Sequence, residues 1–150
     1  MIPKSARQFK EQEHRLLAIW ASDCAEHILP NFEKMYPEDD RPRKAIEAAR
    51  AWERGDLPMV DARKAAFASH AAARMANNAA AQAAARAAGH AAATAHVADH
   101  ARHAATYALK SVSAVADREA VNVESDWQYR RLPEHLRLVL FPKTETVYHK

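Results

Sequence analysis

Four histidines stand among alanines in the stretch AAGHAAATAHVADHARHAA, near the middle of the chain. On a helix that turns about 100° per residue, His96, His100 and His103 fall within about 60° of one another, whereas His90 points away from them. Imidazole titrates near neutral pH, so His96 and His100, with the neighbouring Asp99, are candidates for acid–base catalysis or ligand binding. The simpler interpretation is that these histidines only form hydrogen bonds at a helix surface or an interface.

The same histidines have a spacing that could bind a metal. His96 and His100 stand at i and i+4, from which two imidazoles of one helix reach a single zinc ion, and His103 could extend the set. The pattern H-V-A-D-H lacks the glutamate base of the zinc-protease helix. The residues that could supply a third ligand, if the fold brings them near, are His70, Asp61, Asp99 and Glu47. We predict that the protein binds no metal and needs no cofactor.

A second candidate site is the stretch WASDCAEH, in which Cys24 precedes His27 by one helical turn. A cysteine beside a histidine can form a thiolate nucleophile. Cys24 also falls on the apolar stripe that contains Leu17, Trp20 and Ile28, and free cysteine is commonly buried. We expect packing in the core to be its role.

Charged residues follow a helical stripe further along the chain. Arg43, Glu47, Arg50 and Arg54 stand at i, i+4, i+7 and i+11, as on a solvated helix face. The alternative is a stripe that binds an anion or a partner, since guanidinium groups bind carboxylates and phosphates through two hydrogen bonds. The 22 basic and 19 acidic residues are scattered, and the basic ones lack interleaved aromatics, so nucleic-acid binding is not favoured.

The composition predicts an all-α fold. The 150 residues include only two glycines, although hairpins and phosphate-binding loops usually need them. Alanine, the best helix former, occupies 27 of the 55 residues from 62 to 116. We expect a single helical domain over residues 1–150, ordered over about 5–141 with a flexible tail over 142–150. It should be a bundle of about six to seven helices with a tightly packed, alanine-rich central layer.

Capping and breaking residues predict where the helices lie. They are expected at about 5–29, 31–36, 41–53 and 58–76, with a further helix from 79 that breaks near 101–104. Two more helices should carry Tyr107 and Trp127, and Pro133 should open a last short one. Bulky side chains would fill the edges of the alanine layer; they are Trp20, Phe32, Trp52, Phe67, Tyr107 and Trp127.

Localisation and assembly follow from the same composition. No apolar run approaches the roughly 18–20 residues that span a bilayer, and no secretory signal is visible. A single cysteine excludes an internal disulfide and suits the cytoplasm. Because alanines bury little apolar area, a homodimer interface could complete the core.

Four stretches resemble a known family. They are WASDCAEHILPNFE, DDRPRKAIEAARAWERGD, AAGHAAATAHVADHA and DWQYRRLPEHLRLVL, within residues 15–141. Together they resemble the immunity-protein-5-like family of bacterial helical proteins. The resemblance implies an all-α protein that neutralises a toxin, and a shared site would rest on His90, Thr94, His96 and His100. The candidate binding residues within these stretches are Trp20, Asp23, Arg43, Glu47, His90, Thr94, Trp127 and Gln128.

Two functions are therefore expected from the sequence. The first is a small cytosolic protein that binds a toxin and masks it, with no cofactor and no chemistry of its own. The alternative is an enzyme or small-molecule-binding protein that uses His96 and His100 in a pocket between the alanine-rich helices. Trp20, Trp127 and Arg43 would line that pocket.

Overall fold

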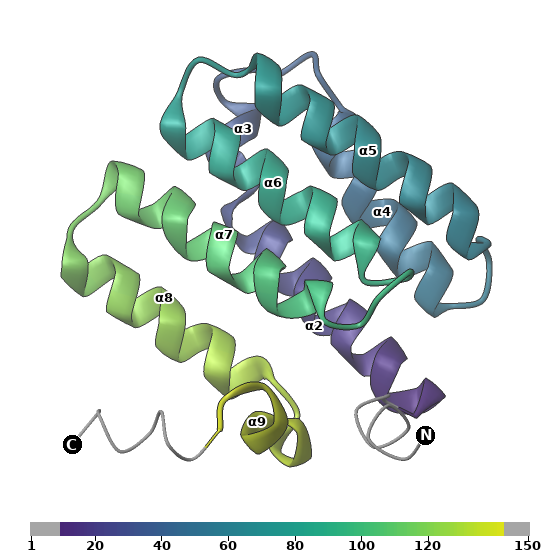
Figure 1. Cartoon of the computed structure of the whole chain (residues 1–150). Helices are drawn as coiled ribbons and strands as arrows, with labels where there is room; N and C mark the ends of the chain where they lie inside the picture. The colour runs from purple at the N-terminus through teal and green to yellow at the C-terminus, as the bar shows by residue number, and fades with distance from the viewer. Residues whose placement is uncertain (1–9, 143–150) are drawn as a thin grey trace.

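The computed structural model describes residues 10–142, which form eight α-helices and no strand (Figure 1). The helices are α2 (Glu11–Ile28), α3 (Pro30–Glu33), α4 (Arg41–Glu53), α5 (Met59–Met75), α6 (Ala79–Ala93), α7 (His100–Val115), α8 (Arg118–Arg131) and α9 (Glu134–Leu140). The predicted all-α bundle is confirmed. The flexible tail predicted for 142–150, and the start of the first helix predicted before residue 10, fall almost wholly outside the described residues.

Helix α6 is the centre of the bundle. It lies between α5 and α7 on one face, with α2 and α4 behind it (Figure 1), and it contacts all four as well as α3. Ten of its fifteen residues are buried, nine of them alanines and the tenth Gly89. Small side chains let neighbouring helix axes approach closely, so the alanine-rich sequence forms the tight central layer that its composition predicts.

Several helix ends lie where local chemistry predicts them. The side chain of Asn78 accepts a hydrogen bond from the backbone N–H of Ala81 and so caps the start of α6. Gly55 ends α4 with φ of +84°, a left-handed conformation that favours glycine. Pro58 is the N-cap residue of α5. These boundaries depend on residues adjacent in sequence.

The predicted position of the break in the long helix from residue 79 is wrong. The chain leaves the helix at Ala93 and resumes at His100, so the break lies at 94–99 and not at 101–104. The side chain of His14 in α2 lies 2.5 Å from the carbonyl oxygen of Thr94. Local helix propensity alone would continue the helix through Thr94. The contact with His14, a residue eighty positions earlier, instead fixes the backbone at Thr94.

The large side chains divide between the core and the surface. Trp20 and Phe32 are almost fully buried in the main core, rather than at its edge. Trp52, Tyr107 and Trp127 are partly buried and pack against the core as predicted. The expectation for Phe67 is wrong, because it lies on the outer side of α5 with 59% of its surface exposed. Across residues 10–142, no helix has the length and apolar character that crossing a membrane requires.

Candidate functional site

Four imidazoles gather where α5, α6 and α7 meet. The ring of His90 in α6 lies 4.9 Å from that of His70, 5.1 Å from that of His100 and 5.2 Å from that of His103, measured between centroids. It also stacks on Tyr107 at 5.3 Å with an angle of 9° between the planes. We call His70, His90, His100 and His103 the histidine cluster.

The turn at 94–99 is what creates this cluster. Because α7 folds back along α6, His100 and His103 come to lie over His90, and the Nδ1 atoms of His90 and His100 are 3.0 Å apart. One of these two nitrogens must carry a hydrogen and the other must accept it. The prediction that His90 points away is therefore wrong, since it assumed one continuous helix.

Gly89 makes room for the fourth ring. A Cβ atom at this position would lie only 2.7–2.9 Å from three ring atoms of His70, closer than real Cβ contacts come. The backbone of α6 therefore has a notch that the imidazole of His70 fills. The Nδ1 atom of His70 is buried there and has no hydrogen-bond partner among residues 10–142. Such an atom is costly to leave unpaired, which is why it marks this region as a candidate site.

The environment keeps His70, His90 and His100 neutral at pH 7. Burial, followed by the charge of the nearby Arg86, lowers the pKa of His70 to about 4. Burial, followed by the charges of His70, His100, His103 and Arg86, lowers the pKa of His90 to about 3. The pKa of His100 is lowered as well, chiefly by burial. Neutral imidazoles at pH 7 can accept a proton or donate a hydrogen bond, but they do not carry the charge that binds an anion.

A carboxylate approaches the cluster only at its exposed end. The Nε2 atom of His103 lies 3.9 Å from Asp99, and both side chains are more than half exposed. Asp99 also pairs with Arg102 at 3.3 Å. Within residues 10–142, no group of three or more His, Cys, Asp or Glu side chains is arranged to hold a metal ion.

The remaining residues expected on this helix have different positions. His96 is exposed in the turn at 94–99, whereas Thr94 is fully buried. The Thr94 hydroxyl donates to the carbonyl of His90 at 2.9 Å. Thr94 thus supports the backbone of the turn, and His100 is the one of the three predicted catalytic candidates that reaches the centre of the cluster.

A second group of predicted residues lies between α2 and α8. Trp20 donates from Nε1 to the carbonyl of Gln128 at 2.8 Å, and the Gln128 amide donates to the carbonyl of Ala105 at 3.0 Å. Trp127 stacks on His27 with ring centroids 3.8 Å apart. Trp20, Trp127 and Gln128 therefore connect α2, α7 and α8.

The ion pairs beside this group extend to α4. Asp23 contacts Arg50 of α4 at 3.0 Å and Arg131 of α8 at 3.1 Å. The Nδ1 atom of His27 lies 2.7 Å from Oε2 of Glu124. We call this the α2–α8 joint, which comprises Trp20, Asp23, His27, Glu124, Trp127, Gln128 and Arg131.

Cys24 is inaccessible within this joint. Its side chain is fully buried, and burial, followed by the charge of Asp23, raises the pKa of its thiol well above the usual value. A raised thiol pKa opposes thiolate formation. His27, the expected activating partner, is instead engaged by Glu124 and Trp127.

The arginine stripe of α4 is largely paired within the protein. Arg43 forms two hydrogen bonds with Glu33, at 2.7 and 2.9 Å, and these hold the pKa of that carboxyl below its usual range. Arg50 pairs with Asp23, and Arg54 with Asp56. Glu47 is exposed. The stripe therefore binds carboxylates of its own chain.

Two residues that shape the histidine cluster could not be recognised from the sequence. His70 was considered only as a possible third metal ligand, and Gly89 was assigned no role. The one signal was Gly89 itself, because an isolated glycine inside a helix usually has a packing reason. Arg86, Tyr107 and Lys110 carried no recognisable motif.

The family of the chain follows from comparison with known proteins. The family model described as "Imm-5 like putative immunity protein" matches residues 7–135, and the chain belongs to this family. The match includes both the histidine cluster and the α2–α8 joint. No curated protein and no solved structure gives a significant match.

Proposed function

We propose that this chain neutralises a toxin in the cytoplasm by binding it as a protein partner and masking it. The observation that carries this proposal is the family match over residues 7–135. Masking needs a stable binding surface and no reaction, which fits a bundle whose Cys24 is buried and whose α4 arginines are paired.

The outer face of α5 is the surface that fits a partner best. Val60, Phe67 and Met75 are exposed there by 54%, 59% and 71%. Arg63 and Lys64 are exposed beside them, and the Arg63 guanidinium lies 5.4 Å from the centre of the Phe67 ring. Exposed aromatic and arginine side chains are the residue types that dominate binding energy at protein interfaces.

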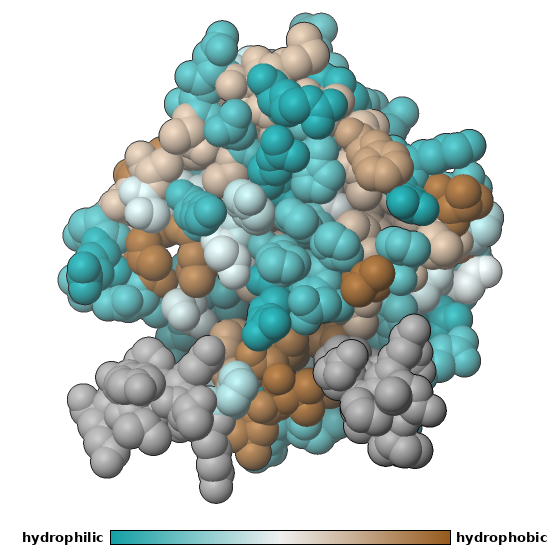
Figure 2. All heavy atoms as spheres, viewed as in Figure 1, coloured by the Kyte–Doolittle hydropathy of each residue, from teal (hydrophilic) through white to brown (hydrophobic). Residues whose placement is uncertain are grey.

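The charge of this face indicates the chemistry of its partner. Arg63, Lys64 and Arg74 form no ion pair with any residue from 10 to 142, unlike the arginines of α4. Figure 2 shows hydrophilic residues over most of this side of the molecule, with apolar residues among them over α5. We therefore propose that the partner presents an acidic surface with a pocket for Phe67.

The test is protection of growing cells. Candidate toxin domains are produced one by one with this chain, and the expected result is restored growth with one of them. Phe67→Asp should weaken the purified complex at least a hundredfold in calorimetry, because it removes the anchor and places a negative charge opposite an acidic surface. Val123→Asp, at an exposed site on α8, is the matched control. Equal loss in both variants, or protection without complex formation, would contradict the proposal.

A further inference from the structure

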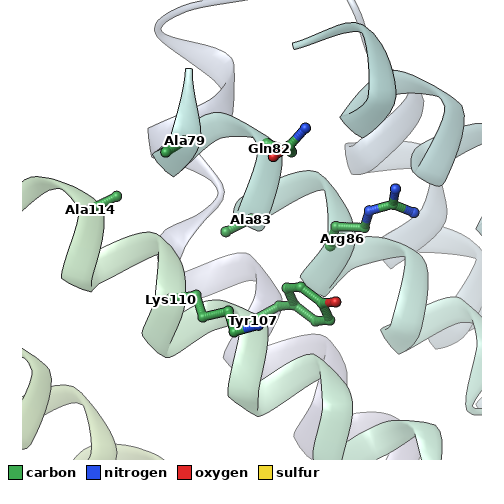
Figure 3. Close-up of a pocket in the computed structure, with 7 residues that line it drawn as sticks. All are labelled: Ala79, Gln82, Ala83, Arg86, Tyr107, Lys110 and Ala114. Atoms are coloured by element: carbon green, nitrogen blue, oxygen red, sulfur yellow. The ribbon is translucent and has the colours of Figure 1, made fainter. Parts of the chain in front are cut away.

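A groove runs between α6 and α7 beside the histidine cluster (Figure 3). Its volume is about 360 Å³, and the residues that line it are Ala79, Gln82, Ala83, Arg86, Tyr107, Lys110 and Ala114. Three of these residues are alanines, whereas Gln82 and Arg86 from α6 and Tyr107 and Lys110 from α7 supply the polar groups (Figure 3). The groove is large enough for a small molecule.

The charge of the groove is positive and uncompensated. Neither Arg86 nor Lys110 forms an ion pair among residues 10–142, and no acidic residue lines the groove. The Lys110 ammonium instead lies 4.6 Å from the centre of the Tyr107 ring. Two cations on adjacent helices, without a carboxylate between them, form an electrostatic site for an anion.

We propose that this groove binds a small phosphate-bearing anion. Arginine and lysine are the side chains that bind phosphate most readily, and the Tyr107 hydroxyl and the Gln82 amide can add hydrogen bonds. The Tyr107 ring already stacks on His90 and lies under Lys110. It therefore offers no free platform for a base, which favours a compact polyanion over a nucleoside.

The groove is coupled to the histidine cluster through Arg86. The charge of Arg86 lowers the pKa of both His70 and His90. A bound anion would offset this charge, so the two imidazoles should bind protons at higher pH when the groove is occupied. The other charged or titratable groups that act on His70 and His90 are Arg74 of α5 and His100 and His103 of α7. His96 and Asp99 of the turn act on His100.

Calorimetry with pyrophosphate tests the proposal at pH 7 and low salt. We expect saturable binding with a Kd below about 1 mM, where electrostatic attraction is least screened. Lys110→Gln and Arg86→Gln should each raise this Kd at least tenfold. Arg118→Gln removes an exposed cation from α8 that forms no ion pair among residues 10–142, and it is the matched control, which should change the Kd less than twofold.

Two further measurements separate this site from adventitious binding. Proton NMR should show that pyrophosphate moves the titration of the His70 and His90 rings to higher pH, and that Lys110→Gln, in a protein of unchanged circular dichroism, abolishes the movement. Citrate should bind at least tenfold more weakly than pyrophosphate. Equal binding of citrate, equal Kd values in all variants, or no saturable binding would overturn the proposal. The toxin experiment is independent of these outcomes, because it varies α5 and not the groove.

Discussion

Two regions of this protein hold histidines in opposite ways. In the α2–α8 joint, His27 lies 2.7 Å from Glu124 and stacks on Trp127, while Asp23 binds arginines of two other helices. In the histidine cluster, His90 contacts other imidazoles, and the buried Nδ1 of His70 has no hydrogen-bond partner in the described part of the chain.

The difference separates structural from functional polar groups. In the joint, charges are paired between helices that are distant in sequence, so these residues hold the bundle together. In the groove that adjoins the cluster, two basic side chains lie without an acidic residue in the lining, so their charges form no such link between helices. Uncompensated charge of this kind is typical of a surface that binds something from outside.

The largest predicted effect concerns the closed core of the joint. A thiol reagent should modify Cys24 more than about a hundredfold more slowly in the folded protein than in urea, because the thiol must wait for local opening. Cys24 is the sole cysteine of the chain, so absorbance reports it directly. If modification is rapid at neutral pH and His27→Gln slows it, Cys24 is an activated thiolate and the joint is not purely structural.

Acid should weaken the protein through the cluster. The folded-state pKa values of His70 and His90 lie below that of an unfolded histidine, about 6.5. The unfolded chain therefore binds protons first as the pH falls. Stability present above pH 6.5 is lost between pH 6.5 and the folded values of about 4 and 3. After allowance for partial exposure, we expect a loss of about 2 kcal/mol between pH 7.5 and 5, measured by urea unfolding.

Substitutions test whether this loss of stability at low pH comes from the histidine cluster. The double substitution His70→Gln and His90→Gln should remove most of the pH dependence, whereas His135→Gln, at an exposed position on α9, should leave it unchanged. The range stops at pH 5 because Glu33 and Asp39, whose pKa values are lowered by arginines, begin to lose their stabilisation below about pH 4.5. An unchanged slope in the double variant would contradict the assignment.

The smallest predicted effect tests the notch at Gly89. Gly89→Ala should lower the free energy of unfolding by about 1 kcal/mol, since overpacking against the His70 ring exceeds the gain in helix propensity. In a His70→Ala background the same substitution should be neutral or stabilising, because the ring is gone. Thermal or urea unfolding of the four proteins gives the coupling directly. Stabilisation of the otherwise unchanged protein would show that no notch exists.

Much of the fold was predictable because its signals are local. Asn78, Gly55 and Pro58 place helix ends through contacts with neighbouring residues, and the scarcity of glycine excludes most β structure. Trp20 and Cys24 were identified as core residues by their helical spacing, and both are buried.

The candidate site was less predictable because a distant contact forms it. Nothing between Ala79 and His103 shows in sequence that His14 holds the carbonyl of Thr94. Without that turn, His90 lies on the wrong side of a continuous helix and the cluster does not exist. The groove was equally hidden, because Arg86 and Lys110 line one groove only after α7 folds back on α6.

The smoothness of α6 has a mechanical consequence. Alanine side chains form shallow ridges, so helices packed on them meet little resistance to sliding along their axes. Polar anchors must then fix the axial position of each neighbour. On the α5 side, the Ser69 hydroxyl donates to the carbonyl of Ala85 at 2.8 Å, and His70 fills its notch. On the α7 side, Ser111 donates to the carbonyl of Ala80 at 2.8 Å. The axial positions of α5 and α7 on α6 thus depend on a small number of polar contacts, and losing one of them would ease sliding of that helix.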